Sequence, residues 1–306
     1  DLQGPIEDAF AAAGGPKPFV RNPMAVGMVA PTVAYHGTPE QKAAYLRPMF
    51  TAEDIWCQLF SEPGAGSDLA ALATRAVRDG DEWVVTGQKV WTSLGHLARW
   101  GFLLARTDPD VAKHKGMTCF VLDMGAPGVE VRPLKQMTGD AEFNEVFMDE
   151  VRIPDSFRIG DVNNGWTVAI TTLMNERTSI GGAVADALAD PLNHLIEVYQ
   201  QRRPGDAVAR DRITQLYIRT EILQYTAERA RQAAEAGNPG AESSVIKLMG
   251  CELNQDLSNA IVDLLGADGL LDEPPAGPDG ETARDTEGPA DTAAADTTGH
   301  TARMRP

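Results

Sequence analysis

The segment Ser61–Asp68, which reads Ser-Glu-Pro-Gly-Ala-Gly-Ser-Asp, combines residue types that suit ligand binding in a tight loop. Its two glycines allow backbone N–H groups to approach a ligand closely, and Ser61 and Ser67 add hydroxyl donors. The same residue types also form ordinary surface turns, so the segment alone leaves both interpretations open. A dinucleotide-binding fingerprint of the Rossmann type is excluded, because no strand–turn–helix–strand unit surrounds the glycines.

A second segment, Gly87–Ser93 (Gly-Gln-Lys-Val-Trp-Thr-Ser), lies at the end of a predicted strand. Side chains two residues apart share a face of a regular strand, so Trp91 and Ser93 would place a flat ring and a hydroxyl donor together. That combination suits a planar heterocycle. Taken alone, Trp91 is more typical of a hydrophobic core than of a cofactor site.

The region that must position both segments, residues 53–155, has the two-residue period of β-strands. Short β-rich runs alternate with turn residues such as Asp79-Gly80-Asp81. The runs are Trp83–Thr86, Gly101–Ala105, Met117–Leu122, Val129–Val131 and Val146–Met148. No long helical pattern separates them, which favours a middle domain of antiparallel β-structure over a doubly wound parallel sheet.

A C-terminal helical domain is predicted over residues 156–271. Its first helix begins near Asn164 and is kinked or ended by Pro191, and further helices are expected over 207–236 and 241–265. The apolar stripe of the first helix comprises Trp166, Ile170, Leu173, Arg177, Ile180, Val184 and Leu188. The predicted fold class is therefore α+β multi-domain: a helical segment, a central antiparallel β domain and a C-terminal helical bundle.

Both ends of the chain indicate an incomplete protein. Residues 1–52 look like a partial helical domain, and its first residues carry neither an initiator Met nor a helix cap. Within it, Thr38–Gln41 has the residue types of a capping box and predicts a helix start. Residues 272–306 contain no Val, Ile, Leu, Phe, Trp or Tyr, so we expect a disordered or frameshifted tail.

The composition excludes several functional classes. The 306 residues carry a net charge of −17, which disfavours nucleic acid as a partner. No apolar stretch is long enough for a membrane span, and no signal pattern is present. Cys57, Cys119 and Cys251 are far apart in sequence, which predicts a reducing compartment, here the cytoplasm, and no disulfide framework. Neither the cysteines nor the histidines have metal-site spacing, so no metal is expected.

Taken together, the two polar segments resemble the acyl-CoA dehydrogenase family. The first, Ser61–Asp68, is followed by Gly-x-Lys-x-Trp-x-Ser in a β region between helical regions. The resemblance extends from about residue 20 to 271 and includes Phe143–Pro154 and Gly165-Trp166. It implies FAD as cofactor, an acyl-CoA as substrate, an electron-transferring flavoprotein as electron acceptor and an oligomeric assembly.

The resemblance implies that the flavin ring lies between the two segments. Cofactor contacts are expected from Gln58, Phe60, Ser61, Gly66 and Ser67 on one side. They are expected from Trp91, Thr92 and Ser93 on the other. The resemblance also implies that Trp91 flanks the ring, that Ser93 forms a hydrogen bond near flavin N5, and that Ser67 also contacts the CoA thioester arm. Leu59 departs mildly from the family pattern.

The reaction of the family requires a carboxylate base. The base removes the α-proton of the thioester while the β-hydrogen leaves as hydride to the flavin, and desolvation must prepare the carboxylate for this role. Most members supply a Glu from a C-terminal loop, which is missing here. A minority place it on the first helix after the β domain, immediately before an Arg, and Glu176 and Arg177 fit that pattern. Arg177 would bind substrate.

Both residues also have ordinary structural interpretations. Glu176 flanks the apolar stripe of its predicted helix, but a Glu there can simply pair with a basic neighbour on the surface. Arg177 can lie at the edge of the stripe and extend its guanidinium to solvent.

Contacts to a neighbouring subunit are less well matched. Relatives use an Arg beyond Arg177 to reach FAD of a second subunit, and Arg202 or Arg203 is the candidate. The family pattern after it is replaced by Pro204–Asp206, and Asp263–Ala267 lacks the expected Gln and one Gly. These gaps leave open a non-catalytic or half-site subunit of a hetero-oligomer. An acyl-CoA oxidase or flavin-dependent hydroxylase on the same fold is a further alternative.

Overall fold

The structure, a computed structural model, describes residues 22–237 and 240–271. Side chains at 178–187, 234 and 243 lie outside that description. The predictions for the start of the chain and for its last segment therefore fall on residues outside the description. Among the described helices, none has the length and apolar character needed to cross a membrane.

Contacts within the chain divide it into two compact units. Of the described residues, 22–183, 237 and 240–247 belong to the first unit, and 184–236 and 248–271 belong to the second. Every strand in the described part of the chain belongs to the first unit, together with both polar segments and Glu176.

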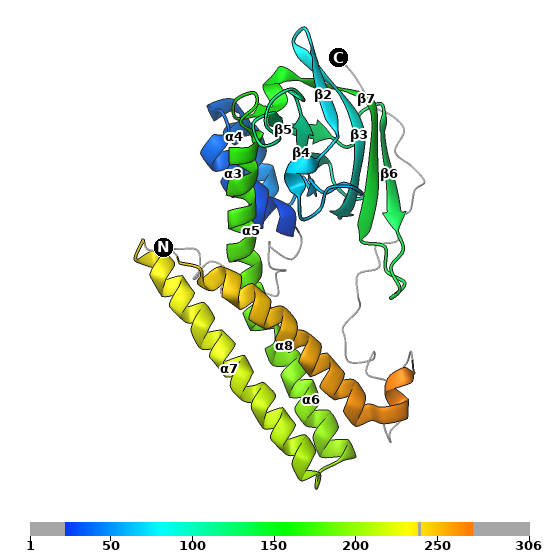
Figure 1. Cartoon of the computed structure of the whole chain (residues 1–306), viewed down its shortest axis with the longest axis vertical. Helices are drawn as coiled ribbons and strands as arrows, with labels where there is room; N and C mark the ends of the chain where they lie inside the picture. The colour runs from blue at the N-terminus through cyan, green and yellow to red at the C-terminus, as the bar shows by residue number, and fades with distance from the viewer. Residues whose placement is uncertain (1–21, 238–239, 272–306) are drawn as a thin grey trace. The chain divides into compact units, whose positions relative to one another are not determined.

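The first unit is built around an eight-stranded sheet (Figure 1). Its strand order is β6-β7-β3-β2-β4-β5-β8, and β1 pairs with β4. The strands are β1 Trp56–Leu59, β2 Arg75–Asp79, β3 Glu82–Ser93, β4 Trp100–Arg106, β5 Met117–Asp123, β6 Val129–Leu134, β7 Phe143–Pro154 and β8 Arg158–Ile159. All five predicted runs lie in strands, and most pairings are antiparallel as predicted. The parallel pairings β1–β4 and β2–β4 were not predicted.

Two apolar cores lie on opposite sides of the central strands. The core inside the folded sheet contains Leu59, Trp83, Val85, Phe120 and Val151, all at most 3% exposed. The second core lies under the helices and joins β1, β4 and β5 to residues of α3, α4 and α5. Alternate residues of β1 and β4 enter different cores, as the two-residue period of a strand requires.

The helices before the sheet are η1 Ala25–Val29, α3 Ala30–His36 and α4 Pro39–Phe50. The predicted capping box at the start of α4 is confirmed: Gln41 N donates to Thr38 Oγ1 at 3.3 Å, and Thr38 N donates to Gln41 Oε1 at 3.0 Å. The Gln41 amide also donates to the carbonyls of Ser156 and Arg158, both at 2.8 Å. The cap thus fixes α4 against the segment that follows β7.

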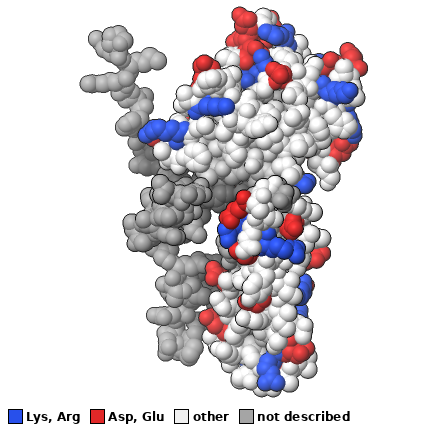
Figure 2. Space-filling model, turned by 90° about the vertical axis from the view of Figure 1, so that its left-hand side faces the viewer, with Lys and Arg blue, Asp and Glu red and all other residues white. Residues whose placement is uncertain are grey.

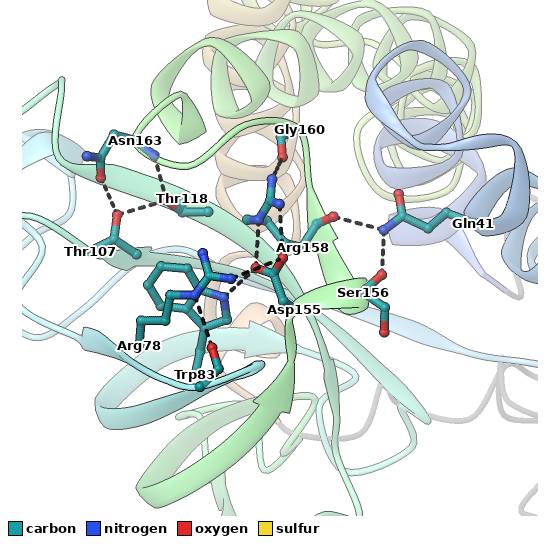
Figure 3. A network of polar contacts seen from close by, with 11 residues as sticks. Gln41, Arg78, Trp83, Thr107, Thr118, Asp155, Ser156, Arg158, Gly160 and Asn163 are labelled. Atoms are coloured by element: carbon teal, nitrogen blue, oxygen red, sulfur yellow. Dashed lines mark hydrogen bonds and ion pairs between the residues drawn. The ribbon is translucent and has the colours of Figure 1, made fainter.

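Asp155 anchors the ends of several strands (Figure 3). It begins η3, Asp155–Phe157, and accepts hydrogen bonds from Arg158 Nε at 2.9 Å and Trp83 Nε1 at 2.7 Å. Arg78 Nη2 lies 4.0 Å from Asp155 Oδ2. The hydrogen bonds from Arg158, followed by that from Trp83, lower the pKa of Asp155 to about 2. The ionised carboxylate therefore joins β3, β7 and β8.

The helix α5, Gly165–Ala187, follows the sheet, and the face it buries differs from the predicted stripe. Val168, Ala169 and Thr172 are fully buried, whereas Ile170 is 42% exposed and Arg177 is exposed. Trp166 and Leu173 flank the buried face, and Ile180 and Val184 lie outside the described side chains. Small residues allow α5 to approach α3 closely, where the hydroxyls of Thr32 and Thr172 are 3.0 Å apart. The face that α5 buries was thus selected by small side-chain size and by hydrogen bonding, and not by hydrophobicity alone.

The second unit is helical. Its elements are α6 Ala189–Arg202, α7 Ala207–Glu235, η4 Gly266–Leu270 and most of α8 Glu242–Leu265. The predicted break at Pro191 occurs earlier, at Leu188, because a proline in the first turn of α6 needs no intrahelical N–H bond. Leucines such as Leu195, Leu223 and Leu257 form its interior. Acidic and basic side chains are intermingled on the face of this unit that Figure 2 shows.

Candidate functional site

The two polar segments lie side by side in the first unit. Val90 N, in the second segment, donates to the carbonyl oxygen of Ser61, in the first, at 2.9 Å. Ser61 is in the loop after β1, and Val90 is near the end of β3, so the bond joins chain segments that are distant in sequence. A ligand that contacts both segments is therefore geometrically possible.

The loop Ser61–Asp68 presents its glycine-rich half to solvent. Glu62 and Ala65 exchange backbone hydrogen bonds of 3.0 Å, which close a small turn. Gly66 and Ser67 are exposed, and within residues 22–237 and 240–271 their N–H groups donate to no protein acceptor. A Cβ atom added at Gly66 would meet nothing within 4 Å. Two adjacent free donors in an open loop suit an electron-rich ligand.

Trp91 occupies a β-bulge at the end of the second segment. The pairing of β3 with β7 shifts register between Lys89 and Thr92, so one extra residue stands on β3. Trp91 has a φ of 58° and is 63% exposed, and its ring packs edge-on against Phe143 with centroids 6.1 Å apart. The bulge interrupts the regular alternation on which the pairing of Trp91 with Ser93 was predicted. It re-aims the indole toward the surface, as bulges near functional sites do.

Two of the expected cofactor residues turn their side chains inward. The Phe60 ring is 5% exposed and packs on Phe102 with centroids 5.9 Å apart. The Thr92 hydroxyl is buried without a hydrogen-bond partner in the described part of the chain. The backbone carbonyl of Thr92 accepts a hydrogen bond from Asn144 Nδ2 at 2.9 Å. A contact from either residue to a ligand would have to come from the backbone.

A buried ion pair that sequence reasoning missed lies between the two segments. Lys89 Nζ is 2.8 Å from Glu62 Oε1, and the two side chains are 0% and 7% exposed. Burial would raise the pKa of Glu62, but the charge and hydrogen bond of Lys89, with bonds from Thr74 and Ala73, lower it overall. Burial lowers the pKa of Lys89 to about 8, because Glu62 only partly offsets desolvation. The available signal was a lysine inside a strand, which demands a buried counter-charge.

Glu176 lies on α5, one helical turn beyond the buried Thr172 and on the same side of the helix. Its side chain is 23% exposed, so it is partly desolvated as predicted. Lys247 Nζ is 4.0 Å from Glu176 Oε1. Both the predicted burial and the ordinary pairing with a basic neighbour are therefore present. Arg177 is exposed.

Arg202 belongs to the second unit. Its guanidinium forms an ion pair with Asp268 at 2.7 Å, in which both side chains are about 40% exposed. The structure thus brings together the residues of the two polar segments, and it places Arg202 in a surface ion pair within its own unit.

Comparisons with known proteins identify the family. Residues 57–151 match the acyl-CoA dehydrogenase middle domain, and residues 163–286 match the acyl-CoA dehydrogenase C-terminal domain. The chain is 47% identical over 244 residues to acyl-CoA dehydrogenase FadE34 of Mycobacterium tuberculosis, which covers 79% of this chain and 34% of FadE34.

Solved structures give the same result. A variant of the Tcur3481-Tcur3483 steroid ACAD superposes with a TM-score of 0.77 at 30% identity, covering 87% of this chain and 69% of that one. The ChsE4-ChsE5 complex from Mycobacterium tuberculosis has a TM-score of 0.71 at 30% identity, covering 86% and 68%. The chain belongs to the acyl-CoA dehydrogenase family, and it spans about a third of the length of FadE34.

The residues around the two segments fit the flavin that this family implies. The hydroxyls of Ser61, Ser67 and Ser93 and the amide of Gln58 form no hydrogen bond with protein atoms in the described part of the chain. Trp91 adds an exposed aromatic surface one residue after Val90, whose N–H is bonded to the Ser61 carbonyl. Unused donors next to an exposed indole are the chemistry that a flat heterocycle with polar edges requires.

Proposed function

We propose that this chain contributes the flavin site of an enzyme that dehydrogenates an acyl-CoA thioester between Cα and Cβ. The observation that carries the proposal is the 2.9 Å hydrogen bond from Val90 N to the Ser61 carbonyl, which joins the two segments expected to enclose the cofactor. Membership of the acyl-CoA dehydrogenase family supports it.

In this proposal the two segments hold FAD between them. Gln58, Ser61, Gly66 and Ser67 bind one side through unused side-chain and backbone donors. Trp91 and Ser93 bind the other, with Phe60 and Thr92 contributing backbone atoms. FAD, when bound, accepts the β-hydrogen of the substrate together with its electron pair. The free N–H of Ser67 also suits the carbonyl of the thioester.

Glu176 is proposed as the base. A base must accept the α-proton at a carboxylate oxygen, and partial burial on α5 limits competition from water at that atom. The helix that carries Glu176 packs through Val168 and Ala169 into the same core as Phe60. With a rise of about 1.5 Å per residue, Glu176 lies about 10 Å along α5 from that contact. Arg177 is proposed to bind the substrate.

A half-site subunit is the second candidate function. Glu176 and Arg202, two residues expected to act on substrate and cofactor, both lie in ion pairs with neighbours of this chain. Two of the solved relatives are named for two chains. In this alternative a second, related chain supplies the remaining groups, and electrons leave to an electron-transferring flavoprotein in either case. The similarity to a protein named as a steroid ACAD favours a bulky acyl group as substrate.

The test measures bound flavin and acyl-CoA-dependent dye reduction for the chain alone and with a co-expressed acyl-CoA dehydrogenase chain. Glu176→Gln is expected to retain flavin and to lower the turnover rate by about 10²–10⁴-fold, the usual contribution of a positioned base. Glu252→Gln, an exposed glutamate on α8, serves as the matched control and is expected to leave the rate unchanged.

Three outcomes separate the candidates. Full activity of Glu176→Gln would move the base to another residue. Flavin that binds only with the second chain would favour the half-site subunit. Turnover that continues in air without the dye, and stops under anaerobic conditions, would indicate an oxidase or hydroxylase instead.

A further inference from the structure

The buried pair of Lys89 and Glu62 connects the two segments of the flavin site. Lys89 Nζ donates to Glu62 Oε1 at 2.8 Å and to the carbonyl oxygen of Phe60 at 2.9 Å. Lys89 belongs to β3, whereas Phe60 and Glu62 flank Ser61 in the loop after β1. One ammonium group therefore binds the loop on both sides of Ser61.

The carboxylate of Glu62 extends this connection to a third segment. It accepts backbone hydrogen bonds from Ala73 N at 2.6 Å and Thr74 N at 2.9 Å, just before β2. Together with Lys89, these bonds engage both carboxylate oxygens. The loop is thus fixed to β3 and to the approach to β2 through a single side chain.

The same contacts support the strained conformation of Trp91. A tryptophan with a φ of 58° persists only where its surroundings hold it. Lys89 lies immediately before the bulge, and Val90 N is bonded to Ser61 at 2.9 Å. After the bulge, Asn144 Nδ2 holds the Thr92 carbonyl at 2.9 Å. Loosening the loop would therefore release one of the two restraints on the indole.

A general energetic argument shows what such a pair contributes. Desolvation of two buried charges offsets much of their attraction, so apolar residues of similar volume would often stabilise a fold equally well. What an ion pair adds is direction, since its hydrogen bonds are satisfied in only one arrangement of the segments. The burial of Lys89 and Glu62 is thus better explained by geometry than by stability.

We propose that Lys89 and Glu62 are positioning residues, which hold the Ser61–Ser67 loop and the Trp91 bulge at the separation that the flavin ring requires. This inference rests on the proposed function, because it takes the ligand of both segments to be FAD. Neither residue is assigned a contact with the cofactor. Their effect passes through Ser61 and Trp91.

In the experiment, FAD is added in steps to the full chain, together with a partner chain if flavin binding needs one. The affinity for FAD and the visible circular dichroism of the flavin are recorded. Glu62→Gln is expected to weaken FAD binding at least about tenfold and to change the dichroism, because a displaced loop no longer matches the ring. The double variant Glu62→Leu with Lys89→Met removes the unpaired charge and is expected to give the same loss in a stable fold. Val151→Ala, in the core inside the folded sheet, is the control. It is expected to lower the thermal stability and to leave the FAD affinity and the dichroism unchanged.

Hydrogen exchange of the same variants separates failure of this inference from failure of the proposed function. Glu62→Gln is expected to accelerate exchange in residues 61–67 and 90–93 together, with or without FAD. Folded variants with wild-type exchange there and FAD affinity within twofold of wild type would overturn the inference. Coupled exchange in a chain that binds no FAD, alone or with its partner, would overturn the proposed function while leaving the coupling of the segments established.

Discussion

Within the described residues, the first unit contains one buried ion pair beside several exposed ones, whereas the ion pairs described in the second unit are all exposed. In the first unit, Lys89 and Glu62 are 0% and 7% exposed, and their hydrogen bonds to backbone groups at residues 60 and 73–74 tie two segments to β3. In the second unit, Arg219 and Asp256 are 2.6 Å apart but 44% and 47% exposed. Water replaces an exposed pair easily, whereas a buried pair must find its partner or leave a desolvated charge. The buried pair of the first unit therefore fixes one loop, whereas the exposed pairs of the second unit leave its fold to apolar helix faces.

The largest expected effect comes from breaking the buried pair. Glu62→Gln leaves the ammonium of Lys89 without a counter-charge, so the free energy of unfolding is expected to fall by about 3–5 kcal/mol. Urea unfolding of wild type and variant measures this difference. The double variant Glu62→Leu with Lys89→Met is the control, and it is expected to recover most of the lost free energy of unfolding. A loss below about 1 kcal/mol would show that the pair is not energetically buried.

An intermediate effect is expected at Asp155. Asp155→Asn removes the charge that Arg158 and Trp83 stabilise, and a pKa lowered to about 2 from 3.8 corresponds to about 2 kcal/mol. Thermal unfolding at neutral pH checks the value against Asp149→Asn, an exposed aspartate of β7. Equal stability of the two variants would contradict the role given to Asp155.

Acid titration tests the same carboxylate by another route. Because the pKa of Asp155 in the folded state lies below its ordinary value, its contribution is fully present above about pH 4 and is lost as the pH falls toward 2. The stability of the wild type is expected to fall more steeply than that of Asp155→Asn across this window. Parallel curves from denaturant unfolding at each pH would exclude the assignment.

The smallest effect is expected in the helical unit. Arg219→Gln removes an exposed pair with Asp256, and the free energy of unfolding is expected to change by no more than about 1 kcal/mol. The effect should shrink further at high salt. A change as large as that of Glu62→Gln, measured in the same urea assay, would remove the contrast between the two units.

Local signals in the sequence predicted much of the first unit. Thr38 and Gln41 predicted a helix start that the structure contains. Gly80 of the predicted turn lies between β2 and β3 with a φ of 63°. Strand β2 was missed because four of its five residues are exposed, so no apolar alternation marks it. Its place in the sheet depends on pairing with β3, which a local pattern does not encode.

The sequence by itself determined the family, the positions of both polar segments and the order of helical and β regions, because residue type, period and caps act over a few neighbours. The tertiary structure decided that Lys89 meets Glu62, that Trp91 stands in a bulge, and that α5 buries Thr172 in place of Ile170. Each of these depends on segments far apart in the chain, where packing volume and the cost of an unpaired charge select the arrangement.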